Sequence, residues 1–173
     1  MWTLLIIAVV VDFLAAFFLA LFYPGYSHME MSMSVLGCVK SPVRIIYNIW
    51  LVILGVLMIL SGILFYKTYY ETSGILAAAG AVICIMYGIG GCILSGIFSV
   101  NETKELESLP EKIHGISAGT GFMALAFMPL IIGLISIKRQ SLLTGVISLI
   151  FLRQAYCFLQ YLLCRKKNLL RGP

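Results

Sequence analysis

Five long apolar runs constrain this chain more than any other feature. They cover residues 2–23, 43–66, 74–99, 113–137 and 142–164. A helix needs about 20 mostly apolar residues to cross the hydrocarbon core of a bilayer, and each run is long enough. Because lipid cannot hydrogen-bond to an open strand, we expect these segments to be helices. The sequence therefore predicts an all-α integral membrane bundle with five transmembrane helices and no soluble domain.

The composition supports this class of protein. Of the 173 residues, 61% are hydrophobic and 11% are charged, whereas soluble domains have about half apolar and a quarter charged residues. The first run has no basic segment before it and no small-residue cleavage site after it, so we expect a retained span rather than a signal peptide. We predict a single multi-pass domain, residues 1–173, in the cell membrane.

Basic residues are unevenly shared between the two faces that five spans would create. We call the face with the N-terminus side A and the face with residues 24–42 side B. Side A carries Lys67, Lys138 and Arg139. Side B carries Lys40, Arg44, Lys104, Lys112, Arg165, Lys166, Lys167 and Arg171. The positive-inside rule then predicts that side B faces the cytoplasm, although half of the basic residues on side B lie in the C-terminal tail. Such charges face lipid headgroups, so we expect membrane lipids as partners and no nucleic acid.

The first connection on side B contains a helix-start pattern, "SHME". Ser27 and Glu30 have the spacing of a capping box, in which each side chain bonds to the other residue's backbone N–H. A helix over about 28–36 would then end at Gly37, a residue type that favours helix C-termini. Its apolar and polar faces predict a short interfacial helix.

The second connection on side B repeats the device as "SLPE". Ser108 and Glu111 form the box, and Pro110 lies in the first turn, where proline is tolerated. This box would start the fourth span and place His114 about one turn inside it. The two histidines of the chain, His28 and His114, are therefore expected on the same membrane face.

Small residues recur every four positions along the third span: Gly80, Cys84, Gly88, Cys92 and Gly96. Such a stripe lets helix backbones approach closely, which favours packing within the bundle. The alternatives are a ligand cleft and a homo-oligomer formed through Gly80, Gly88 and Gly96. The five cysteines of the chain form no CxxC motif, and four lie in spans, so neither a disulfide framework nor a cysteine metal site is predicted.

Two charged residues lie deep inside predicted spans. Asp12 is about ten residues into the first span and Arg153 about eleven into the fifth, so both are near the midplane at about 1.5 Å per residue. A lone charge there costs at least about 2.5–3.5 kcal/mol, which favours a mutual ion pair. The pair could fix helix register or serve a proton or ion relay. Asp12 could also be protonated.

Polar residues expected near side B form a second candidate site: His28, Glu30, Asn48, His114 and Ser117. Two histidines with a carboxylate are a minimal zinc set, two histidines could ligate haem iron, and serine with histidine and acid could hydrolyse lipids. The sequence has no HExxH and no HxxxH, so it assigns no catalytic residue, no metal site and no cofactor. Hydrogen bonding and capping, or a lipid or small-ligand site, are favoured over catalysis.

The segments "YPGYSHMEMSMSVLG" and "HGISAGTGFMALAFMPL", with Asn48 between them, resemble the DUF998 family of multi-pass prokaryotic membrane proteins. A looser similarity is to DRAM-like membrane proteins. Members of the first family usually have six spans, and often an acidic residue where this chain has Val35. The resemblance implies a multi-pass architecture and supplies no biochemical activity.

These observations favour a non-enzymatic membrane protein that binds lipid or a small apolar ligand near the face with His28 and His114. The first alternative is a metal-dependent or serine-type membrane hydrolase that uses His28, Glu30 and His114. The second alternative is a small transporter with Asp12 and Arg153 as its midplane site.

Overall fold

The computed structural model describes residues 2–99, 101 and 108–170, with side chains to residue 158 and at residue 160. The described chain is helical. In chain order its elements are α1 (Trp2–Ala20), the 3₁₀ helix η1 (Met33–Gly37), α2 (Arg44–Tyr69), α3 (Gly74–Met86), the π-helix η2 (Tyr87–Leu94), α4 (Ser95–Ile97), α5 (Leu109–Leu125), α6 (Met128–Lys138) and α7 (Leu142–Leu170).

Four stretches of the described chain are long and apolar enough to cross a membrane: Trp2–Ala20, Arg44–Tyr69, Gly74–Ile97 and Leu109–Lys138. They match the first four predicted spans. The fifth predicted span is α7, whose apolar described part, Leu142–Phe158, is shorter. The prediction of an all-helical membrane bundle is confirmed.

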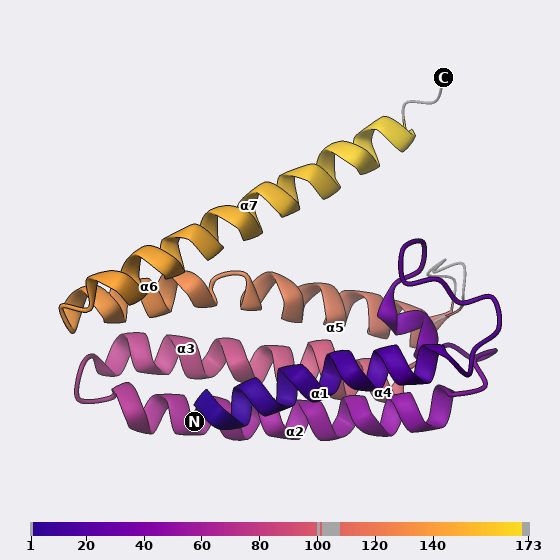
Figure 1. Cartoon of the computed structure of the whole chain (residues 1–173), viewed down its shortest axis with the longest axis horizontal. Coiled ribbons are helices and arrows are strands. Elements are labelled where there is room, and N and C mark those ends of the chain that lie inside the picture. Colours follow the sequence, from indigo (N-terminus) through magenta and orange to yellow (C-terminus); the bar gives the residue numbers. More distant parts are fainter. Residues whose placement is uncertain (1, 100, 102–107, 171–173) are drawn as a thin grey trace.

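The helices form a bundle with one divergent member (Figure 1). The third span, α3–η2–α4, packs against α2 on one side and against α5 and α6 on the other. α1 packs on α2. α7 packs on α6 and then leaves the bundle at an angle, away from α5 (Figure 1). The two ends of the bundle are sides A and B, and η1 lies at side B with the connection after α1.

The glycine stripe of the third span packs inside the chain. A side chain at Gly88 would meet the Gly55 carbonyl oxygen of α2 at 2.7 Å, and one at Gly96 would meet the Asn48 carbonyl oxygen at 2.8 Å. A side chain at Gly80 would collide with the ring of Phe65, which is also on α2. These three glycines therefore face α2, and a surface for self-association would have to lie elsewhere. Whether copies of the chain associate stays a prediction.

A winding change explains how the stripe stays on one face. In an α-helix each residue turns by about 100°, so steps of four residues overshoot by about 40° and drift around the helix. A π-helix has roughly 4.4 residues per turn, so a step of four residues there falls short of a full turn. Because the third span is α-helical to Met86 and π-helical over Tyr87–Leu94, the two deviations offset each other. The four-residue repeat thus remains directed at α2.

The fourth span is broken into two helices, which the sequence prediction did not include. α5 ends at Leu125, and α6 begins at Met128 with Pro129 in its first turn. Proline has no backbone N–H to continue the hydrogen-bond ladder, and its ring crowds the preceding turn. The residues between the helices, Ala126 and Phe127, form a turn.

The predicted helix over 28–36 needs a correction. A short helix does follow α1, but it is the five-residue 3₁₀ helix Met33–Gly37. Near the expected start there is only one turn, in which the N–H groups of Glu30 and Met31 donate to the Ser27 carbonyl oxygen. Residues 35–38 are buried, and Leu36 belongs to the bundle core. The segment is therefore held by the core at side B and is not an amphipathic helix lying on the surface.

Candidate functional site

The start of α5 positions His114, as the capping pattern predicted. The backbone N–H of Ser108 donates to the Glu111 carboxylate at 2.8 Å, and the capping box is complete. The same carboxylate accepts a hydrogen bond from the side-chain amide of Asn101. Glu111 is buried, so its charge is held by these donors. His114 follows one turn later and is buried.

The His114 ring caps the end of the third span. Its Nδ1–H donates to the carbonyl oxygens of Phe98, at 2.7 Å, and Ser95, at 3.1 Å. The last carbonyls of a helix lack partners within that helix, and here a neighbouring helix supplies one. With Nδ1 donating, the neutral ring keeps Nε2 as an acceptor. Ser117 donates to the His114 backbone carbonyl at 3.2 Å, so its hydroxyl does not bond to the ring.

A second polar group lies at the start of α2. Asn48 donates from Nδ2 to the Ser99 hydroxyl at 3.2 Å and to the Gly37 carbonyl at 3.4 Å. Arg44 donates from Nε to the same Ser99 hydroxyl at 3.0 Å. The Asn48 Oδ1 atom is buried and has no hydrogen-bond partner among the described residues. Sequence reasoning selected Asn48 but used Arg44 only as a surface charge; their i, i+4 spacing on one helix was the available signal.

Beside these residues runs a groove of about 560 Å³ between α2 and α4, which we call the α2/α4 groove. Its lining residues are Arg44, Ile45, Asn48, Ile49, Val52, Ile53, Gly96 and Ile97. Arg44 and Asn48 form its polar end. Ile49, Ile53 and Ile97 are exposed on the outside of the bundle, where a membrane protein meets lipid. The groove thus combines a cationic end at side B with an apolar wall that runs toward the membrane interior.

The two histidines do not form one site. His28 is exposed, with its ring edge-on to Tyr26 at 4.9 Å between centroids and parallel to Phe17 at 6.3 Å. The His114 ring instead bonds to the carbonyls of Ser95 and Phe98 at the end of the third span. The two histidines therefore have no contact residue in common. Glu30 is exposed. Within the described ranges no group of three or more His, Cys, Asp and Glu could hold a metal ion.

Tyr26 adds a polar atom beside His28 that sequence reasoning did not select. Its hydroxyl is buried and has no hydrogen-bond partner in the described part of the chain. Burial raises the pKa of Tyr26 above its usual range, so the hydroxyl stays protonated at neutral pH. It is therefore a neutral donor near side B.

A family model described as "Protein of unknown function (DUF998)" matches residues 6–169. The chain belongs to the DUF998 family. The resemblance inferred from the loop and fourth-span segments is confirmed, and with it the multi-pass membrane class. No curated protein matches this DUF998 chain, and no solved structure does.

The midplane charges of this DUF998 chain are not brought together. Asp12 accepts a hydrogen bond from the Trp50 indole N–H at 2.9 Å, so its partner lies on α2. Arg153 is exposed on α7, which packs on α6. The expected Asp12–Arg153 pair is therefore replaced by an Asp12–Trp50 bond. Matched depth in two spans does not determine which helices are neighbours. α1 packs on α2, whereas α7 packs on α6 and then leaves the bundle at an angle (Figure 1).

Proposed function

We propose that this DUF998 protein binds a membrane lipid or a small apolar ligand near side B, in the α2/α4 groove. The observation that carries the proposal is the groove itself, which places the Arg44 guanidinium and the Asn48 amide at one end of an apolar wall. A lipid has the same division, with a polar headgroup followed by apolar chains. Ligand sites in proteins are commonly concave, mostly apolar and furnished with a few polar groups.

His114 supports this function as a positioning residue. It holds the carbonyls of Ser95 and Phe98, which flank the groove residues Gly96 and Ile97. The histidine therefore fixes the α4 wall of the groove without entering it. In this proposal His114 supports the groove wall, and His28 does not line the groove.

The other two functions considered have less support. The Ser117 hydroxyl donates to a backbone carbonyl, so no serine–histidine pair for hydrolysis is formed there. The transporter hypothesis relied on Asp12 and Arg153 as a pair, and the Asp12 carboxylate is bonded to Trp50. A binding function therefore fits the site better than catalysis or transport.

The test fills the groove with a large side chain. Ile49 lines the groove, whereas Ile46 is exposed on the same helix and does not line it. Delipidated protein in mild detergent is unfolded thermally with and without added phosphatidylethanolamine. We expect the lipid to raise the unfolding temperature of the wild type and of Ile46→Trp, and to have little effect on Ile49→Trp.

Native mass spectrometry of the same three proteins supplies a second readout. The wild type and Ile46→Trp are expected to retain a bound lipid at detergent concentrations where Ile49→Trp has lost it. Equal lipid retention and equal thermal shifts in all three proteins would exclude the α2/α4 groove as the binding site.

A further inference from the structure

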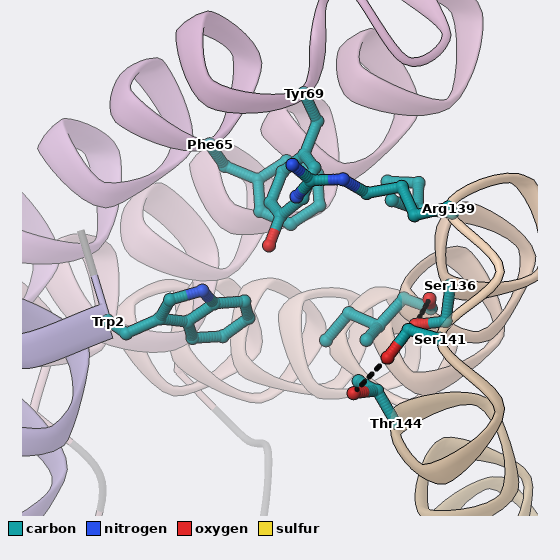
Figure 2. Close-up of a pocket in the computed structure, with 9 residues that line it drawn as sticks. Trp2, Phe65, Tyr69, Ser136, Arg139, Ser141 and Thr144 are labelled. Atoms are coloured by element: carbon teal, nitrogen blue, oxygen red, sulfur yellow. Dashed lines mark hydrogen bonds between the residues drawn. The ribbon is translucent and has the colours of Figure 1, made fainter.

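A second cavity lies at the opposite face, side A, where the start of α1, the end of α2 and the α6–α7 turn meet. Its volume is about 380 Å³. The residues that line it are Trp2, Phe65, Tyr69, Ile132, Ile135, Ser136, Arg139, Ser141 and Thr144. Figure 2 shows the Arg139 guanidinium beside the Tyr69 ring, with Trp2 on one side and Ser141 and Thr144 on the other. Ligand pockets typically occupy about 300–1,000 Å³, so this cavity is in the size range of a headgroup site.

The polar groups of this side A cavity favour an anion. Among the described residues that line the cavity, Arg139 is the only charged one, and its guanidinium carbon lies 5.4 Å from the centre of the Tyr69 ring. The cation is thus oriented by an aromatic face instead of by a carboxylate within the lining. The Ser141 and Thr144 hydroxyls lie 3.0 Å apart and bond to each other, which leaves one hydroxyl hydrogen to donate. The Tyr69 hydroxyl is a further donor in the lining.

The turn between α6 and α7 determines the positions of Arg139 and Ser141. The Gln140 N–H donates to the Ile137 carbonyl at 3.1 Å, and the Ser141 N–H donates to the Ser136 carbonyl at 2.9 Å. With Gln140 at a φ of +54°, this is a Schellman motif. The left-handed residue reverses the chain within one position, so Arg139 at the end of α6 and Ser141 at the start of α7 both line the cavity.

The floor of the cavity is apolar. Phe65 and Ile135 are buried, and Ile132 lies beside them in the lining. The cavity therefore offers a cation and hydroxyl donors toward the membrane surface and an apolar surface below them. A free ion would satisfy only the first part, whereas a lipid headgroup with the start of its chains would satisfy both.

We propose that the side A cavity binds the phosphate group of an anionic lipid, with Arg139 as its cationic ligand. Arginine presents several N–H donors in a planar fork that matches phosphate oxygens. The Ser141–Thr144 pair and Tyr69 donate to the remaining oxygens, and the acyl chains begin along Phe65, Ile132 and Ile135. This site is separate from the α2/α4 groove and does not depend on ligand binding at side B.

The experiment uses Trp2 as a local reporter in the full chain. The chain has two tryptophans, so the difference in emission between the wild type and Trp2→Phe belongs to Trp2. Both proteins are placed in phosphatidylcholine nanodiscs that contain increasing amounts of brominated phosphatidylglycerol or brominated phosphatidylcholine. Bromine quenches tryptophan at short range, so quenching of Trp2 measures which lipid occupies its surroundings.

We expect brominated phosphatidylglycerol to quench Trp2 at a several-fold lower mole fraction than brominated phosphatidylcholine. Arg139→Gln should remove this preference. Lys138→Gln is the matched control, because Lys138 is the adjacent basic residue, is exposed, and does not line the cavity. It should keep the preference, although the net charge of the protein falls by the same amount.

Equal quenching of wild-type Trp2 by the two lipids would overturn the proposal without reference to any variant. Loss of the preference in Lys138→Gln as well as in Arg139→Gln would also overturn it, because the effect would then be general surface charge. Soluble glycerol phosphate distinguishes the sources of the phosphate group. If millimolar glycerol phosphate leaves the preference intact, a lipid supplies the phosphate; if it abolishes the preference, the lipid assignment is wrong and a soluble phosphate ester is the ligand.

Discussion

His114 donates from Nδ1 to two carbonyls at the end of the third span. This structural role can be tested separately from any role of Nε2. His114→Ala leaves the Ser95 and Phe98 carbonyls without this partner, so we expect the free energy of unfolding to fall by about 1–3 kcal/mol. The side-chain amide of asparagine can take the place of Nδ1–H. His114→Asn is therefore expected to retain most of the stability lost in His114→Ala.

Thermal unfolding of the three proteins in one detergent checks this expectation. If asparagine destabilises the protein as much as alanine does, the cap on α4 is not the main contribution of His114. If both variants match the wild type, the two hydrogen bonds contribute nothing to stability.

A local pattern at the residue scale predicted one helix start and failed at the other. The Ser108–Glu111 box could be inferred because capping depends on a fixed spacing of three residues, but the same spacing at Ser27 and Glu30 is followed by a single turn and no helix. The partner of Asp12 could not be inferred, since depth along a span says nothing about the direction in which a side chain points. Trp50, the actual partner of Asp12, carried no signal beyond its place near a span end, where tryptophan is common.

The α6–α7 turn gives a test at the element scale. Gln140 has a φ of +54°, a conformation that costs a residue with a Cβ atom about 1–2 kcal/mol, while glycine adopts it freely. Gln140→Gly is expected to raise the free energy of unfolding by about 0.5–1 kcal/mol, after the entropy of the unfolded glycine is subtracted. Lys138→Gly, at the last residue of α6, should lower it by up to about 1 kcal/mol, the cost of glycine in a helix interior. Thermal unfolding should show that Gln140→Gly stabilises the protein and Lys138→Gly destabilises it. Changes of opposite sign would identify Gln140 as the left-handed position.

Helix positions followed from the apolar runs, but helix interruptions did not. Pro129 was visible inside the fourth run and marks the break between α5 and α6. The spacing of the stripe from Gly80 to Gly96 predicts close helix packing, and its contacts to α2 agree with that prediction. A strict repeat of four, sustained over several turns, also contained the signal for π winding, because an α-helix alone would carry it around the axis.

The whole molecule has an orientation that the charges predict. We expect side B to face the cytoplasm. Cys38 is fully buried and unsuitable as a label site, so cysteines are introduced at two exposed positions, Met29 on side B and Glu71 on side A. In a Cys164→Ser background, a membrane-impermeant maleimide should label Glu71→Cys in intact cells and Met29→Cys only after permeabilisation. The reverse pattern would place side B outside.

At this scale the sequence predicted the class of fold and the approximate spans, because these depend on hydrophobicity summed over many residues. It did not predict which helices are neighbours. The α2/α4 groove and the side A cavity each join residues from distant segments, such as Arg44 with Ile97 and Trp2 with Arg139. Such sites arise from helix packing, which depends on contacts between distant segments and not on local patterns.

The π winding of η2 also affects which changes in length this chain can tolerate. A π-helix holds more residues per turn than an α-helix, so the loss of one residue, such as Ile89, can be absorbed if this segment returns to α winding. The flanking helices α3 and α4 would then keep their faces on α2. The loss of one residue in α2, such as Leu57, would instead turn everything beyond it by about 100°. Single-residue deletions should therefore be tolerated in the third span and not in the second, which comparison of expression and thermal stability of the two deletion variants can establish.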